Sequence, residues 1–227
     1  MFDGVEHSNV VVDVVLPCLD EAQALPWVLS RMPSWARPVV VDNGSIDGSA
    51  EIAAELGATV VHERQRGYGA ACHAGLSVAS APWVAVMDCD ATLDPRHLGP
   101  MVAVAGLEAG RPVLVVGRRV PEGAGAWPWH LRLANREVAR RVNRRTGLRL
   151  ADIGPIRLAP RLALLSLALS DRRFGYPVET VVRAAEAGWR VVQMEVPYAP
   201  RSGRSKVTGT PTGVIRAVRD MSAVLSR

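Results

Sequence analysis

Apolar and helix-like segments alternate along the first 120 residues of the chain. Short runs rich in β-branched residues occupy 10–16, 38–41, 58–62, 83–87 and 113–116. Between them, alanine and leucine recur at helical spacing in 22–32, 47–56, 69–79 and 95–109. Near-continuous valine runs are typical of strands buried on both faces, so we predict an α/β fold with a mostly parallel central sheet between helix layers. Ligands bind such sheets at the carboxyl ends of the strands.

The second half of the chain has a more mixed pattern. A loop rich in Pro, Gly and Trp at 121–130 precedes a basic helix that we expect to end at Gly147. Segment 157–168 predicts a short strand and a leucine-rich helix, 178–187 a helix, 191–196 a strand, and 201–213 a loop. The last helix places Val214, Val218, Met221 and Leu225 on one face. We expect one domain over residues 1–227, because neither a repeat nor a second domain is evident.

Composition favours a protein without membrane spans. The 227 residues are 48% hydrophobic, which is enough to bury a core, and no apolar run reaches the roughly 18 residues that cross a bilayer. The acidic N-terminus does not resemble a secretion signal, so we expect a cytoplasmic protein, with peripheral contact at the inner face of the membrane as a further option. Three scattered cysteines, Cys18, Cys72 and Cys89, do not form a disulfide framework or a zinc site.

Charge divides the chain into two unlike halves. Residues 1–110 contain 14 acidic and 5 basic side chains, whereas 111–227 contain 8 acidic and 22 basic ones. We therefore expect the first half to bind a nucleotide and a metal, and the second to bind an anionic acceptor. The acidic half argues against a nucleic-acid partner. Lys206 is the only lysine beside 26 arginines.

Acidic residues follow three of the predicted strands. Asp20 and Glu21 follow the first, Asp42 the second, and Asp88 and Asp90 the fourth. At one edge of a parallel sheet these carboxylates would repel each other unless they bind donors or a cation. Strand alternation would place Asp88 and Asp90 on one side, where Mg²⁺ or Mn²⁺ could be shared with a diphosphate. The alternative is that the acids only cap the next helix.

Four motifs in chain order resemble family 2 glycosyltransferases with the GT-A fold, whose N-terminal half is Rossmann-like. LPCLDEA resembles the family's P-x-x-[ND]-E, VVVDNGSIDGS its V-D-[DN]-G-S-x-D-G, GYGAACHAG its G-x-G-x-A, and MDCDATLDP its metal-binding D-x-D. The resemblance implies transfer of a sugar from a UDP-, GDP- or dTDP-sugar with inversion, using Mg²⁺ or Mn²⁺.

Later motifs are similar to the polyprenyl-phosphate sugar synthases of this family. VGRRV points to Arg119, LADIGPIRLAPR to Asp152, although that segment is one residue short, and FGYPVET to Glu179. RSGRSK matches R-x-G-x-S-K at every fixed position. Where mannose synthases often have a glutamine after the D-x-D, this chain has Thr92, which leaves the third metal ligand open.

The resemblance assigns a role to each of these residues. It implies metal binding by Asp88 and Asp90, and phosphate binding by Arg201, Ser205 and Lys206. Glu179, with Asp152 second, is the candidate catalytic residue, as a base for an alcohol acceptor or as a group that orients a phosphate acceptor. The implied nucleotide-sugar site consists of Pro17, Leu19, Asp20, Glu21, Asp42, Asn43, Gly69, Asp88 and Arg119.

A polyprenyl phosphate is the acceptor that we expect. The alternatives are a soluble acceptor with a hydroxyl group and, more remotely, a sugar-phosphate nucleotidyltransferase, which would need a glycine-rich phosphate loop near residue 20. Four arginines, Arg132, Arg136, Arg140 and Arg144, recur every four residues along one helix face. They form a solvated face or contact anionic lipid.

Overall fold

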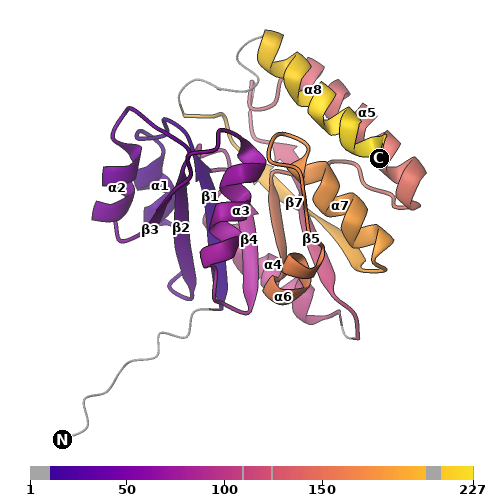
Figure 1. Ribbon diagram of the computed structural model, residues 1–227, viewed down its shortest axis with the longest axis horizontal. Coiled ribbons are helices and arrows are strands. Elements are labelled where there is room, and N and C mark those ends of the chain that lie inside the picture. Colours follow the sequence, from indigo (N-terminus) through magenta and orange to yellow (C-terminus); the bar gives the residue numbers. More distant parts are fainter. Residues whose placement is uncertain (1–10, 109, 124, 203–210, 227) are drawn as a thin grey trace, which may run out of the picture.

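A computed structural model describes residues 11–108, 110–123, 125–202 and 211–226, without the side chains of 211–215 (Figure 1). The strands are β1 (Val12–Cys18), β2 (Ala36–Asp42), β3 (Thr59–His62), β4 (Trp83–Met87), β5 (Val113–Pro121), β6 (Ile156–Pro160) and β7 (Arg190–Tyr198). The α-helices are α1 (Leu25–Ser30), α2 (Ser49–Glu55), α3 (Tyr68–Val78), α4 (Leu98–Gly106), α5 (Trp129–Thr146), α6 (Arg161–Ser166), α7 (Tyr176–Glu186) and α8 (Pro211–Leu225). A short 3-10 helix, Pro95–His97, precedes α4.

All seven strands form one mixed sheet in the order β3-β2-β1-β4-β6-β5-β7. Neighbouring strands are parallel except at β6, which runs antiparallel to both β4 and β5. The predicted α/β class with a mostly parallel sheet is confirmed. Because β1, β2 and β4 are mutually aligned in one direction, their carboxyl ends meet at one edge, where the sequence places its acidic residues.

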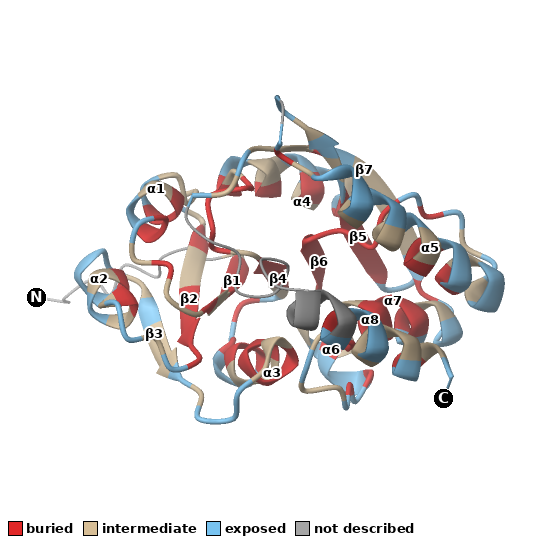
Figure 2. Ribbon diagram, turned by 90° about the horizontal axis from the view of Figure 1, so that it is seen from above, coloured by how far each residue is buried: buried red, intermediate tan, exposed pale blue. Residues whose placement is uncertain are grey.

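Helices cover both faces of the sheet, as Figure 2 shows from above. Val14 and Leu16 of β1 belong to one core cluster with residues of α1, α2 and α4, whereas Val15 belongs to a second cluster with residues of α3, α5, α6, α7 and α8. This alternation explains the unbroken valine runs, because each face of the strand is buried against a different helix layer. None of the helices in the described part of the chain has the length and apolar character needed to span a membrane.

Strands β5 and β7 are longer than the sequence pattern predicts. They pair in parallel from Val113 and Arg190 to Pro121 and Tyr198, although the apolar runs end at residues 116 and 196. Gly117 sits where a Cβ would approach Ile156 Cγ2 to 2.3 Å, so only glycine fits between β5 and β6 there. The extension carries Arg119 beyond the core and up to the carboxyl edge.

One helix boundary agrees with its prediction and another differs from it. Helix α5 ends at Gly147, which adopts the left-handed conformation with φ +74°, as expected for a glycine after a helix. Helix α8 begins at Pro211, within the segment predicted to be a loop. Proline is favoured in the first turn of a helix because it has no N–H to leave unpaired.

Candidate active site

A cleft of about 760 Å³ opens at the carboxyl edge of the sheet. Both halves of the chain line it, which explains how an acidic and a basic segment contribute to one site. The structure brings eight of the predicted site residues to the lining: Pro17, Leu19, Glu21, Asn43, Asp88, Asp90, Arg119 and Arg201. Asp20, Asp42, Gly69, Asp152 and Glu179 lie behind that lining, and Ser205 and Lys206 fall outside the described residues.

Asp88 and Asp90 lie in the turn that follows β4, because the strand ends at Met87. The strand-alternation argument was therefore wrong in its detail, although both residues line the cleft. Asp88 is half-buried, and burial together with the nearby charge of Asp90 raises the pKa of its carboxyl to about 6. Ala91 completes the turn with a φ of +62°, a left-handed conformation that is uncommon for a residue other than glycine.

Thr92 positions the Asp90 carboxylate. Its backbone N–H and its hydroxyl donate to Asp90 Oδ1 at 3.1 and 2.6 Å. Thr92, which stands where the resembling family has a glutamine, thus orients the Asp90 carboxylate through Oδ1. The other oxygen of Asp90, Oδ2, is 3.2 Å from Arg201 Nη1.

Arg201 connects the two charge halves of the chain. Its guanidinium contacts Glu21 through Nη2 and Asp90 through Nη1, and the neighbouring Ser202 N–H donates to the Asp90 carbonyl at 3.2 Å. A cation is therefore already held among these carboxylates by the protein itself. Carboxylates that converge in this way favour a cation between them, whether an arginine or a metal ion.

The acidic residues also fit a divalent metal ion whose remaining ligands come from the phosphates of a bound substrate. Within the described ranges, no cluster of three or more His, Cys, Asp or Glu side chains could hold a metal ion. Mg²⁺ is usually bound by one or two carboxylates plus substrate phosphates and water, so the pair Asp88 and Asp90 is sufficient when a diphosphate is present. Burial and the charge of Asp90 both raise the pKa of Asp88, and a cation between the two carboxylates would offset their repulsion.

Asn43 and Asp42 hold the loops that follow β2 and β3. Asn43 donates through Nδ2 to the carbonyls of Glu63 and Gln65, and its Oδ1 accepts from the Gly67 N–H at 2.8 Å. Asp42 accepts from the Ser45 N–H at 2.9 Å and lies 3.3 Å from His62 Nδ1. Burial opposes ionisation of Asp42, but the bonds from Ser45 hold its pKa below the ordinary value.

Asp20 and Gly69 perform similar structural tasks. Asp20 Oδ1 accepts from the Ile46 N–H at 2.9 Å, which ties the loop after β1 to the loop after β2. Gly69 donates to the Arg173 carbonyl at 3.0 Å, and a Cβ at this position would lie 2.4 Å from the Asp171 carbonyl oxygen. The glycine therefore allows the 170–173 loop to lie directly on the first turn of α3.

Asp152 holds Arg119 at the cleft. Its carboxylate accepts from Arg119 Nε at 2.9 Å, from Nη2 at 2.7 Å and from the Arg119 backbone N–H at 2.9 Å. The guanidinium also lies over the Trp127 ring, with its carbon 3.9 Å from the ring centroid. Burial opposes ionisation of Asp152, but the Arg119 side chain more than offsets it and lowers the pKa.

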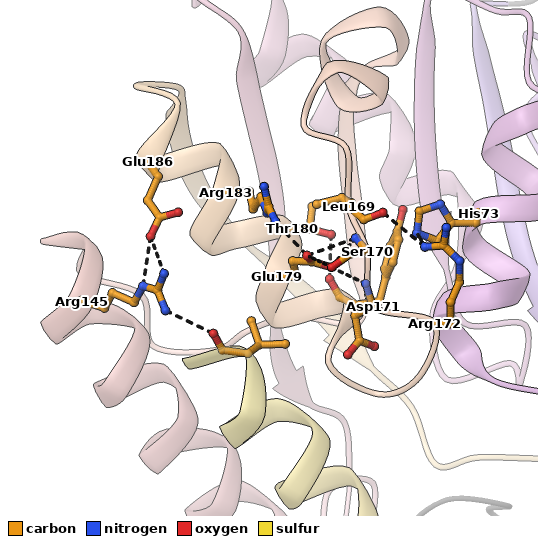
Figure 3. Close-up of polar contacts among 12 residues, drawn as sticks. His73, Arg145, Leu169, Ser170, Asp171, Arg172, Glu179, Thr180, Arg183 and Glu186 are labelled. Atoms are coloured by element: carbon orange, nitrogen blue, oxygen red, sulfur yellow. Dashed lines mark hydrogen bonds and ion pairs between the residues drawn. The ribbon is translucent and has the colours of Figure 1, made fainter. Parts of the chain in front are cut away.

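Glu179 is not among the lining residues of the cleft, and it holds a loop through the contacts that Figure 3 shows. It is 3% exposed, and its carboxylate accepts from the Ser170 N–H and hydroxyl and, at 2.7 Å, from the Asp171 N–H. Arg183, one turn along α7, lies 3.5 Å from it. These contacts fix the same 170–173 loop that packs against Gly69, so the expected role of Glu179 at the acceptor is not supported by direct access to the cleft.

Arg157 is a buried cleft residue that the sequence reasoning missed. It lies on β6, is 4% exposed and lines the cleft. Nη2 donates to the carbonyl oxygens of Ile153 and Gly154, whereas Nε and Nη1 have no hydrogen-bond partner among the described residues. An arginine inside the otherwise apolar run IRLAP is the signal that could have identified it.

Comparisons with known proteins agree with this geometry. The family described as Glycosyl transferase family 2 matches residues 13–167. An uncharacterized glycosyltransferase of Mycobacterium tuberculosis is 48% identical over 216 residues, covering 95% of this chain and 98% of the relative. A dolichyl-phosphate hexose transferase of Haloferax volcanii is 30% identical over 205 residues, covering 89% of each protein.

A solved structure gives the same picture of the fold. Glucosyl-3-phosphoglycerate synthase from Mycobacterium tuberculosis, in complex with Mg²⁺ and uridine-diphosphate, superposes with a TM-score of 0.73 at 20% identity. The similarity covers 94% of this chain and 77% of that one.

Proposed function

Since the chain belongs to glycosyltransferase family 2, we propose that it transfers a sugar from a nucleotide sugar to a polyprenyl phosphate, with inversion at the anomeric carbon. Family membership makes it a glycosyltransferase, which removes the nucleotidyltransferase alternative, and the predicted GT-A fold is confirmed. A lipid phosphate as acceptor is supported by the relative named as a dolichyl-phosphate hexose transferase.

The proposal rests mainly on the buried and incompletely hydrogen-bonded guanidinium of Arg157. A buried guanidinium with two nitrogens, Nε and Nη1, that have no hydrogen-bond partner among the described residues costs free energy unless a ligand accepts from them. A phosphate monoester offers several oxygens that match the planar fork of an arginine. Arg119 also lines the cleft, and both guanidinium groups act electrostatically on Asp88. Arginines inside the cleft favour an anionic acceptor over a neutral alcohol.

The chemistry of a phosphate acceptor suits the remaining residues. One phosphate oxygen attacks the anomeric carbon and forms the new C–O bond, while the bond from that carbon to the nucleoside diphosphate breaks and its electron pair leaves with the diphosphate. A phosphate monoester is already ionised at neutral pH, whereas an alcohol must lose a proton to a base. Both predicted candidates for a base, Glu179 and Asp152, are engaged in hydrogen bonds behind the cleft.

The acidic residues of the cleft suit the nucleotide-sugar donor. Asp88 and Asp90 would hold Mg²⁺ or Mn²⁺, as the structural relative with bound Mg²⁺ and uridine-diphosphate makes reasonable. When bound, the ion would stabilise negative charge on the leaving diphosphate. Glu21 and Asn43 lie on the side of the cleft where base and ribose would bind, and Arg201 provides a further positive charge toward the phosphates.

An apolar extension of the cleft supports a long hydrocarbon chain on the acceptor. It runs between α5 and α8 and is lined by Leu131, Val138, Val218 and Met221. A small polar acceptor would leave these side chains uncovered. An isoprenoid chain would bury them, at roughly 25 cal/mol for each Å² of apolar surface removed from water.

The proposal is tested by turnover of a panel of UDP-, GDP- and dTDP-sugars with polyprenyl phosphate and with soluble alcohols, followed as release of nucleoside diphosphate. We expect turnover with the lipid phosphate. Arg157→Gln should raise the KM for it by about 10- to 150-fold, the value of a hydrogen bond to a charged group, while donor affinity is unchanged. Arg161→Gln, a nearby arginine outside the cleft lining, is the matched control.

Two results would contradict the proposal. One is efficient turnover of a soluble alcohol with none of a polyprenyl phosphate. The other is an Arg157→Gln protein with wild-type melting temperature and an unchanged KM for the lipid phosphate.

A further inference from the structure

The outer face of α5 combines exposed apolar and basic side chains. Trp129 is 72% exposed and Leu133 56% exposed. Both lie at the N-terminal end of the helix and share one side of it with four arginines, at the helical spacing of three and four residues. We call this surface the α5 outer face, and it consists of Trp129, Arg132, Leu133, Arg136, Arg140 and Arg144.

This face is also concave and strongly positive. All six residues line a groove of about 1170 Å³ between α5 and the ends of β5 and β7. Its two acidic lining residues are already paired, Glu195 with Arg118 and Asp152 with Arg119. Arg140 pairs with Glu137, but among the described residues Arg132, Arg136 and Arg144 form no ion pair. Three arginines are therefore available for an anionic partner.

We propose that the α5 outer face docks the enzyme on an anionic phospholipid bilayer. The inference rests on the proposed lipid acceptor, which resides in such a bilayer. Tryptophan is favoured at the boundary between headgroups and hydrocarbon, and each arginine near an anionic leaflet adds attraction to its phosphates. A nucleic acid would match the arginines, but not the exposed leucine beside them.

The opposite side of α5 lines the catalytic cleft. Leu131 and Ala134 project from it into the catalytic cleft, and Val138 continues the same side. α8 lies beside α5 at the same end of the molecule, as Figures 1 and 2 both show, and carries the exposed Val218 and Arg219. A bilayer docked on the α5 outer face would therefore lie one helix width from the apolar part of the cleft, which shortens the path of an acceptor from the bilayer to the site.

Co-sedimentation of the full chain with vesicles tests the docking. We expect binding to vesicles of phosphatidylglycerol and phosphatidylcholine, and none to phosphatidylcholine alone, with binding weakened by high salt. The double variant R132Q/R136Q should lower the partition coefficient roughly 30-fold, since each arginine near the surface contributes about fivefold. The control R111Q/R190Q removes the same charge at the opposite ends of β5 and β7 and should bind like wild type.

A second variant pair tests the apolar contribution. W129S/L133S should also weaken binding, whereas L107S/L162S, at two exposed leucines on α4's end and α6, should not. Equal losses in the control and test pairs would overturn the proposal, because they would show a general charge or solubility effect. Binding of RNA oligonucleotides through the α5 arginines, with no vesicle binding, would overturn it as well.

The outcome is separable from that of the proposed function. A short isoprenyl phosphate that dissolves in water should be glycosylated equally by wild type and R132Q/R136Q, because docking is not needed. Loss of turnover by R132Q/R136Q only with vesicle-embedded acceptor supports the docking. Turnover of the soluble acceptor without vesicle binding would refute the docking and leave the proposed reaction intact.

Discussion

Replacement of Asp152 by asparagine separates a catalytic base from a residue that positions Arg119. The Asp152 side chain is 1% exposed and the Arg119 side chain 17%, so the pair is shielded from solvent. Removing one partner of a buried pair costs about 3–5 kcal/mol. Asparagine keeps one oxygen that can accept from Arg119, so we expect Asp152→Asn to lower the free energy of unfolding by about 2–4 kcal/mol.

Thermal and urea unfolding give the first readout. For a chain of this size each kcal/mol lowers the melting temperature by about 2–4 °C, so a fall of roughly 5–15 °C is expected. In kinetics, a displaced Arg119 should raise the KM for the acceptor about tenfold or more while kcat changes less. A catalytic base would show the opposite result, with a wild-type melting temperature and a 10²- to 10⁴-fold loss of kcat. That combination would refute the assignment of Asp152 to positioning.

The pH dependence of stability provides an independent check. Burial alone would raise the pKa of Asp152, but the bonds from Arg119 hold it below the ordinary value. A lowered native pKa stabilises the fold at pH values above the unfolded pKa of about 3.9, and this stabilisation is lost as pH falls through the native pKa. The difference in unfolding free energy between wild type and Asp152→Asn should thus be constant from about pH 5 to 8 and shrink below about pH 4.

Two further predictions concern the other acidic residues. Asp90→Asn should abolish the stabilisation that UDP with Mn²⁺ gives in a thermal-shift assay, and it should remove most activity. Asp94→Asn should do neither, because Asp94 lies outside the cleft lining and pairs with Arg96. Full activity of the wild type in EDTA would contradict this prediction. Glu179→Gln should lower the free energy of unfolding by about 1–3 kcal/mol with less than a tenfold change in kcat, because the Glu179 carboxylate accepts hydrogen bonds from Ser170 and Asp171. The control is Glu186→Gln, at an exposed residue of the same helix that pairs with Arg145. A 10³-fold loss of kcat in Glu179→Gln would instead identify Glu179 as a base.

The N-terminal half of the fold was predictable because its chemistry repeats along the chain. Each valine run in β1, β2 and β4 must be buried on both faces, and each is followed by an acidic residue, so the parallel sheet and the acidic edge follow from one pattern. Strand β6 had no such signal. It runs antiparallel to its neighbours, and Arg157 within it is buried at the cleft by contacts that span distant segments.

Side-chain direction limited the predictions about catalytic residues. The resemblance selected Glu179 and Asp152 by their motifs, but a motif does not specify which neighbour a carboxylate faces. Glu179 turns toward the 170–173 loop because three donors from Ser170 and Asp171 converge on it there. Asp152 turns toward Arg119 because the extension of β5 beyond residue 116, which polar residues disguise in the sequence, brings that guanidinium within reach.

Arg201 joins the basic half of the chain to the acidic half. This residue belongs to the basic half, yet it contacts Glu21 and Asp90, two carboxylates of the acidic half. A cleft made of either half alone would repel part of a bound nucleotide sugar, metal and phosphate acceptor, because these ligands carry both signs of charge. Joining the two halves at the sheet edge places carboxylates and arginines within one site, which is the arrangement that the proposed transfer between two anionic ligands would require.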